Sequence, residues 1–318
     1  MNYRDAKKLQ EKVKRKIFVG LLIFLCAVIA GLCVFSAFFP VESWKYYFHL
    51  PTVSVRGERE TRVHYLNAKN GSCTLVELSD GKTVLVGGGA DDGEARKNIL
   101  RFINALKVKK IDAVVVPDAT SRGVGALREI ARFYEVGAVY LPQKDGSNAE
   151  YLSFIADVER KDVPVYRAAQ GDLFIGDDYS LKVLFPLLDG SSVSELSLLL
   201  SCGGTDVLLG AGCSEETMDV LLMDKQMGLM EKWGVALDDL EIVSFESAAN
   251  LLSLECFIKA YHCKTAIFSC MGGNAYAPSE EGLSLLLENG VTSYKTYQDG
   301  YITVSILGDG YTVTTEKQ

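Results

Sequence analysis

The sequence predicts a layered α/β domain that follows one N-terminal transmembrane helix. Two observations carry this prediction. Residues 17–39 form an uncharged run of 23 residues, and the chain after residue 60 alternates short β-type runs with helix-type runs. Alternating strands and helices build domains in which helices cover sheets. With 318 residues, 48% of them hydrophobic, the chain can bury one large core or two small ones.

The apolar run Ile17–Phe39 is long enough to cross a membrane. At 1.5 Å per helical residue it covers the roughly 30 Å of a hydrocarbon core. A cleaved signal peptide is the alternative, but its apolar region usually spans about 7–15 residues. A lipoprotein signal is a second alternative, although the residues before Cys33 match a lipidation box poorly. The run therefore predicts an anchor whose partner is the lipid bilayer.

Charge on either side of the span predicts its orientation. Residues 1–16 carry seven Lys or Arg against two acidic residues, and such a cluster beside a span is retained in the cytoplasm. The rest of the chain should then be extracytoplasmic, in a single-pass protein of the cell membrane. A nucleic-acid-binding tail is the weaker interpretation because the charges directly abut the span. Beyond residue 16 the chain carries 26 basic and 39 acidic residues, so nucleic acid is a poor partner.

Residues 40–60 read as a linker, and residues 61–318 as the domain. Three apolar runs joined by Asn70-Gly71 and Asp80-Gly81 predict antiparallel strands, because these dipeptides favour tight turns. A helix containing Ile99 and Ile103 follows, with Asp91 or Asp92 as its cap. A continuous apolar strand comes next. The expected ranges are strands 62–66, 73–78, 83–86 and 113–116.

A second half repeats the order of strands, helix and strand. Its expected strands are 198–202, 205–209, 242–245 and 265–269, its helices 214–233, 252–260 and 279–289, and its closing strands 301–306 and 311–315. Eight cysteines occur, none in a CxxC pair, and the spacing of Cys256, Cys263 and Cys270 fits no zinc knuckle. These cysteines are expected to be structural thiols with at most one disulfide.

Three stretches resemble the start of the metallo-β-lactamase domain of ComEC-type competence proteins. They are RVHYLNAKNGSCTLVEL from Arg62, DGKTVLVGGGA from Asp80, and KKIDAVVVPDATSRGVGALREI from Lys109. In that family the corresponding turns read LDVGQGD, DxG and THxHxDHxGG. The resemblance implies a four-layer αββα sandwich, and in active members a zinc site that generates hydroxide.

The family's ligand positions do not hold ligands in this chain. Asp118, Thr120, Arg122 and Gly123 stand at the positions of its His, His, Asp and His. Asn67 and Ser72 replace the two carboxylates of the LDVGQGD turn, and Gly87-Gly88-Gly89 replaces DxG. The family's HHGS segment corresponds to residues 246–249, and its later histidine-containing loop to residues 274–278. The chain has three histidines, His49, His64 and His262, and none are at ligand spacing.

These substitutions predict a pseudoenzyme with no metal cofactor and no catalytic residue, serving a binding or assembly role at the cell surface. A hydrolase using Asp118, Arg122 and Glu246 is the first alternative, and a DNA-uptake component the second. Asp118 and Glu246 could bind a hard cation, but a salt bridge to Arg122 is the plainer outcome. The expected vestigial cleft comprises Asn67, Ser72, Asp118, Thr120, Arg122, Glu246 and Asn274.

Overall fold

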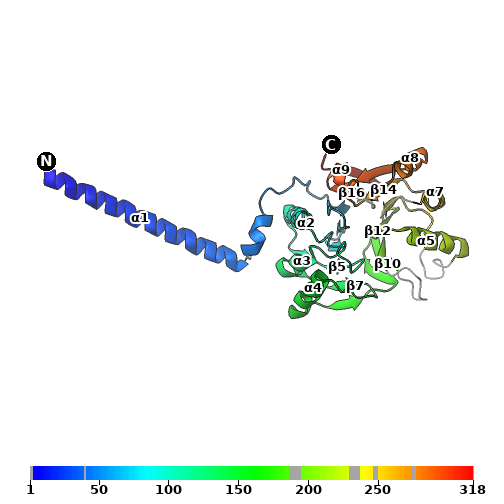
Figure 1. Ribbon diagram of the computed structural model, residues 1–318, viewed down its shortest axis with the longest axis horizontal. Coiled ribbons are helices and arrows are strands. Elements are labelled where there is room, and N and C mark those ends of the chain that lie inside the picture. Colours follow the sequence, from blue (N-terminus) through cyan, green and yellow to red (C-terminus); the bar gives the residue numbers. More distant parts are fainter. Residues whose placement is uncertain are drawn as a thin grey trace. The chain divides into compact units, whose positions relative to one another are not determined.

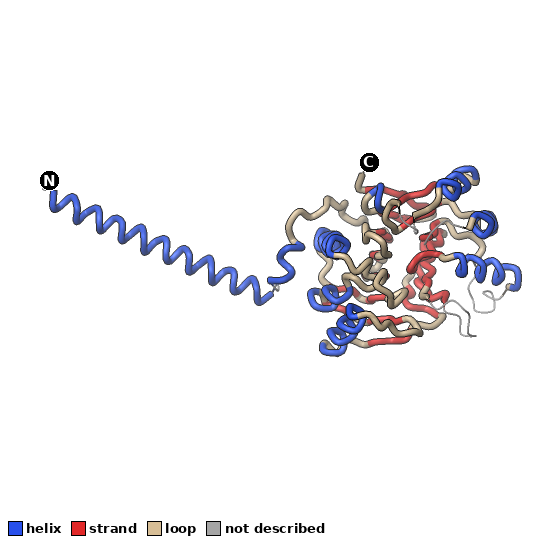
Figure 2. The backbone as a smooth tube through the Cα atoms, viewed as in Figure 1, coloured by secondary structure: helices blue, strands red, loops and turns tan. Residues whose placement is uncertain are grey.

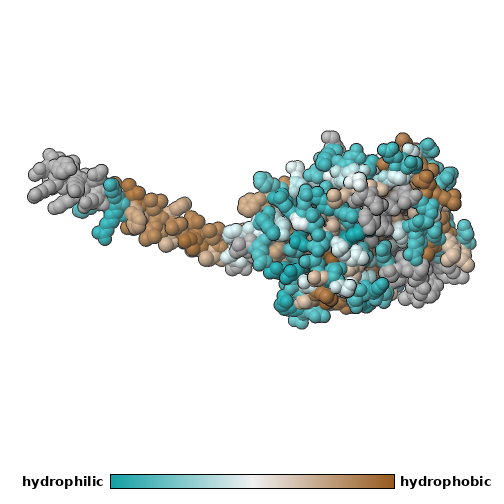
Figure 3. Space-filling view, in the orientation of Figure 1, coloured by the Kyte–Doolittle hydropathy of each residue, from teal (hydrophilic) through white to brown (hydrophobic). Residues whose placement is uncertain are grey.

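The computed structural model describes residues 3–38, 41–185, 195–228, 237–245, 250–273 and 277–317. The chain divides into two compact units, residues 1–48 and 49–318. The first unit holds helix α1, Tyr3–Phe38, and the short 3-10 helix η1, Val41–Tyr46. Within α1, the segment Lys12–Ser36 is long and apolar enough to cross a membrane, and its side chains are exposed. It forms the brown band in Figure 3.

In the described residues, unit 49–318 is built on two large sheets (Figure 1). The first has the order β17-β16-β1-β2-β3-β5-β7-β8 and the second β15-β14-β13-β12-β11-β10-β9. Strands of the first sheet are β1 Thr61–Tyr65, β2 Thr74–Glu77, β3 Thr83–Val86, β5 Ala113–Val115, β7 Val139–Leu141, β8 Val165–Arg167, β16 Ile302–Leu307 and β17 Gly310–Thr315. Those of the second are β9 Gly171–Ile175, β10 Tyr179–Phe185, β11 Ser197–Cys202, β12 Thr205–Cys213, β13 Ile242–Phe245, β14 Thr265–Phe268 and β15 Thr292–Lys295. A small pair, β4 Lys110–Ile111 and β6 Glu135–Val136, stands apart.

Helices cover the outer face of each sheet (Figure 2). On the first sheet they are α2 Gly93–Ala105, α3 Leu127–Phe133 and α4 Ala149–Arg160; on the second α5 Glu215–Met227, α7 Leu251–Ala260 and α8 Glu280–Glu288. One further short helix, α9 Thr296–Asp299, follows β15. The Asp92 carboxylate accepts hydrogen bonds from the main-chain N–H groups of Glu94 and Ala95, so Asp92 is the N-cap of α2.

Apolar residues fill the space between these layers, as two of the interfaces show. The inner faces of the sheets form one, which includes Val63, Val84, Leu198 and Val304. A second lies between the second sheet and its helices, with Phe245, Phe257 and Phe268 among its members. The predicted α/β/β/α sandwich is therefore the fold of this domain. All eight cysteines are free, and five of the six outside the span are buried.

The three predicted strands at the start of the domain are confirmed. β1 pairs antiparallel with β2, and β2 with β3. The closing strands β16 and β17 do not belong to the second half as predicted: β16 pairs with β1, with Val63 opposite Val304. A β1 edge left open would expose unpaired backbone groups, and β16 covers it. The predicted helix 214–233 corresponds to α5, which ends at Met227. Residues 229–233 lie outside the part of the chain that the structure describes.

The segment before β1 is bound to the domain. Tyr301 Oη donates to the main-chain oxygen of Thr52 at 2.5 Å. The Arg62 guanidinium donates to the main-chain oxygens of Ser54, at 2.8 Å, and Val55, at 3.0 Å. The Arg56 side chain reaches the main-chain oxygen of Leu78. The segment 52–56, which we call the strap, thus lies on the domain surface.

Candidate functional site

Three loops of the first sheet meet at one end of it, at the positions that the sequence singled out. They are residues 66–73 after β1, 87–92 after β3, and 116–126 after β5. Main-chain hydrogen bonds join them: Gly89 N–H donates to the Ser72 oxygen at 2.9 Å, Gly88 N–H to the Gly123 oxygen at 2.6 Å, and Asp91 N–H to the Ser121 oxygen at 2.7 Å. The predicted cleft residues of this sheet are therefore brought together.

Glycine allows these loops to approach so closely. An added Cβ at Gly71 would lie well under 3.0 Å from the main chain of Arg122 and Ala90, a separation that real Cβ atoms essentially never show. A Cβ at Gly125 would meet the main chain of Ala90 in the same way. Gly89, at φ +72°, adopts a backbone conformation that residues with a side chain rarely take. Close main-chain packing therefore accounts for the glycine-rich loop.

Asp118 and Thr120 form a local turn. The Asp118 carboxylate accepts a hydrogen bond from the Thr120 main-chain N–H at 2.7 Å and another from the Thr120 hydroxyl. The hydroxyl oxygen of Thr120 also accepts a hydrogen bond from the main-chain N–H of Arg122 at 3.2 Å. Such side-chain-to-backbone bonds are typical of Asx and ST turns. In this loop the carboxylate is thus used to shape the chain.

Arg122 occupies the centre of the loops. Its side chain is half-buried, and its Nε donates to the main-chain oxygen of Asn70 at 3.2 Å. The guanidinium therefore ties the third loop to the first. The predicted partner Glu246 lies outside the described residues, as does Asn274, so the expected ion pair with Glu246 stays a prediction.

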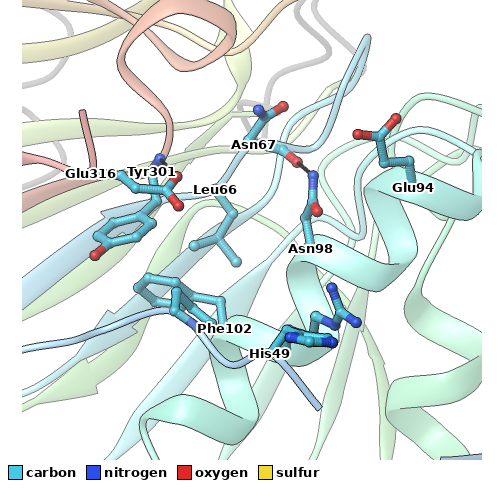
Figure 4. A pocket seen from close by; sticks show the side chains of 10 residues that line it. His49, Leu66, Asn67, Glu94, Asn98, Phe102, Tyr301 and Glu316 are labelled. Atoms are coloured by element: carbon cyan, nitrogen blue, oxygen red, sulfur yellow. Dashed lines mark hydrogen bonds between the residues drawn. The ribbon is translucent and has the colours of Figure 1, made fainter. Parts of the chain in front are cut away.

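Asn67 and Ser72 also act through the main chain. The Asn67 oxygen accepts from Asn98 Nδ2 of α2 at 3.2 Å, drawn as a dashed line in Figure 4. Ser72 is buried, and its main-chain oxygen accepts from Gly89, as above. Both positions are thus used to hold the first loop against its neighbours.

The second sheet adds Cys270 and Lys295, which the sequence reasoning did not single out. Cys270 follows β14 and is buried, and Lys295 ends the neighbouring strand β15. Burial raises the pKa of the Cys270 thiol to about 11, although the charges of Lys295 and Arg122 act to lower it. At neutral pH the thiol is protonated, so it is not a nucleophile.

The described residues contain no group of three or more His, Cys, Asp or Glu side chains that could hold a metal ion. His64 lies on β1, buried, with Nδ1 2.8 Å from Thr303 Oγ1 and Nε2 2.9 Å from Glu77 Oε2. Burial lowers its pKa, which favours the neutral ring. His262 is exposed and pairs with Asp239 at 2.7 Å. Both imidazoles thus have structural partners away from the loops.

Two pockets lie beside the loops. One, of about 320 Å³, lies after β5 and β7 and is lined by Asp118, Thr120, Asp145, Asn148 and Glu195 among others. The other, of about 310 Å³, has the paired rings of Phe102 and Tyr301 on one side, with centroids 4.9 Å apart (Figure 4). Both volumes are at the small end of the range of ligand pockets. The lining of the first is polar and that of the second combines polar and aromatic side chains, so both suit a small polar molecule.

Replacing Arg122 with alanine is expected to lower the free energy of unfolding by about 1–2 kcal/mol. The substitution removes the charged donor that binds the main-chain oxygen of Asn70. A hydrogen bond to a charged group contributes about 1–2 kcal/mol to stability when solvent partly screens the charge. Chemical denaturation of the full chain in detergent measures the difference. Lys97→Ala is the matched control, because Lys97 is an exposed cation on α2 and its loss should change stability by less than about 0.5 kcal/mol. Equal denaturation midpoints for the two variants would show that Arg122 does not tie the loops together.

Comparison with known proteins gives likeness of structure alone. No family model matches the chain, and no curated protein sequence matches it. A metal-dependent hydrolase of the β-lactamase superfamily superposes with a TM-score of 0.48 and 12% identity, over 76% of this chain and 98% of that chain. YhfI, a metallo-β-lactamase fold protein from Bacillus subtilis, gives 0.47 and 12% over 74% and 95%. A diphosphatase from the PhnP family gives 0.43 and 13% over 77% and 98%. These likenesses assign no activity to the chain.

Proposed function

We propose that this chain is a membrane-anchored, extracytoplasmic binding or assembly protein whose sandwich domain has lost a metal site. What supports the proposal is the use made of the loop residues. The Asp118 carboxylate binds the main chain of its own loop, and Arg122 brings a permanent cation to the place where a metal would need anionic or imidazole ligands. The loop residues that the structure describes do not fit a zinc centre.

The binding role draws support from the pocket after β5 and β7. Its lining carries three carboxylates, Asp118, Asp145 and Glu195, and one cation, Lys144. A lining of this kind favours a polar or cationic group on the ligand. Such a ligand would be held by charge and hydrogen bonds, and nothing in the loop would activate a nucleophile against it.

A hydrolase with a rebuilt site is the second candidate. Its supporting observation is that Asp118, Asp145 and Glu195 line one pocket, where carboxylates are placed for acid–base chemistry. A screen of the full chain against phosphodiester and ester substrates tests it. Loss of any detected turnover in Asp118→Asn, with the fold intact, would establish the hydrolase in place of the binding protein.

A role in DNA uptake related to ComEC is the third candidate, and the charge balance opposes it. The chain beyond residue 16 has 13 more acidic than basic residues, whereas DNA binding depends on neutralising phosphates. Binding of labelled DNA at low salt, where such attraction is strongest, should therefore be undetectable. Saturable binding that weakens steeply with salt would support the uptake role.

We expect the melting temperature of the protein to be unaffected by zinc, manganese or calcium. A metal that binds only the native state, at about one hundred times its Kd, adds roughly 2.7 kcal/mol, which would raise the melting temperature by roughly 5–10 °C. Differential scanning fluorimetry of the purified chain, with each metal and with a chelator, measures this. A reproducible rise that is abolished by Asp118→Ala or Glu246→Ala would identify a rebuilt metal site and contradict the proposal.

A further inference from the structure

We infer that the aromatic segment Trp44–Phe48, which follows the span, is itself a membrane-binding element that lies in the interfacial layer of the bilayer. We call this segment the collar. It holds Trp44, Tyr46, Tyr47 and Phe48, so four of its five residues are aromatic. The inference rests on the proposed span and goes beyond it, because it assigns a second lipid contact outside the helix.

The position of Trp44 carries the inference. Its ring lies 5.4 Å from the ring of Phe35, measured between centroids. Phe35 is three residues before the end of α1 at Phe38, so it is roughly 5 Å from the end of the helix. Trp44 therefore lies beside the last turn of the span. If the span crosses a bilayer, this ring is at the level where hydrocarbon meets headgroups.

The chemistry of the collar suits that level. Tyr47 and Phe48 are 41% and 61% exposed, whereas Tyr46 is buried, so two of the four rings of the collar present apolar surface. Tryptophan and tyrosine concentrate at membrane interfaces because one part of the ring system is apolar and another is polar. Lys45 Nζ lies 4.8 Å from the centroid of the Tyr46 ring, and a lysine there can direct its ammonium toward headgroups.

Depth-dependent quenching of Trp44 tests the inference. The chain has two tryptophans, so Trp233→Phe leaves Trp44 as the only one. The full chain is reconstituted in phosphatidylcholine vesicles that carry bromine either near the top of the acyl chains or near their methyl ends. We expect a blue-shifted Trp44 emission, quenched more strongly by the shallow bromine. Water-like emission without quenching, or stronger quenching by the deep bromine, would overturn the interfacial placement.

The variant that carries both Trp44→Phe and Trp233→Phe has no tryptophan, so it is the matched control and gives the background emission. A separate readout tests the span itself: alkaline carbonate extraction followed by vesicle flotation. A chain that is extracted contradicts the proposed anchor. A chain that floats but leaves Trp44 unquenched contradicts the collar alone.

Discussion

Replacing Gly125 with alanine should lower the free energy of unfolding by about 3 kcal/mol or more, a large fraction of the roughly 5–15 kcal/mol by which an ordinary domain is stable. The added Cβ would lie far inside contact distance of the main-chain oxygen and carbon of Ala90. Neither atom belongs to a flexible side chain, so a whole loop must move. That movement would break the bonds from Gly125 N–H to the Gly89 oxygen and from Ala126 N–H to the Gly88 oxygen, both 2.9 Å long.

Gly310→Ala is the matched control. Gly310 begins β17, and no atom lies within 4 Å of an ideal Cβ there. The substitution should be neutral or slightly stabilising, because alanine reduces the freedom of the unfolded chain. Urea denaturation of both variants, followed by circular dichroism, separates the two effects. Similar midpoints for Gly125→Ala and the wild type would mean that the loops can separate without cost, which would contradict their close main-chain packing at Gly125.

Much of the fold was predictable because its signals are local. Alternating runs and the Asp80-Gly81 turn identified β2 and β3, and the Asp92 cap marked the start of α2. The sheet to which β16 belongs was not predictable in this way. Its pairing with β1 joins residues more than 230 positions apart, and no turn signal encodes so distant a contact. Strands and helices between residues 139 and 185 were also missed, because that region matched no family motif.

The loops that carry the motif positions meet at one end of a sheet, and their role as a site stays a prediction. The sequence did not indicate that Asp118 would shape a turn or that Arg122 would bind a main-chain oxygen, since both depend on the tertiary approach of the loops. Lys295 was missed because it comes from the other sheet, at the end of a strand with no motif of its own. The spacing of residues along the chain does not show how close two residues from different sheets lie in the fold.

Reversing the charge of four residues before the span should turn part of the protein around in the membrane. Lys and Arg within about 15–20 residues of a span determine which end stays in the cytoplasm, and acidic residues count for little. Four reversals leave three basic residues on the N-terminal side, against Lys45 and Arg56 shortly after the span. With so small a difference we expect a mixture of orientations. The reversed residues are Lys12, Lys14, Arg15 and Lys16.

Reporters fused after residue 318 measure the outcome, one active only in the cytoplasm and one active only outside it. The unaltered chain should activate only the reporter that works outside the cytoplasm. The variant with four reversed charges should activate both reporters. Reversing Arg4, Lys7 and Lys8 as well removes every Lys and Arg before the span and should activate the cytoplasmic reporter. The matched control reverses four exposed lysines far from the span and should leave the orientation unchanged; these are Lys97, Lys107, Lys109 and Lys317. Cytoplasmic activity from the unaltered chain would place the domain inside the cell, so any partner would then have to be sought there.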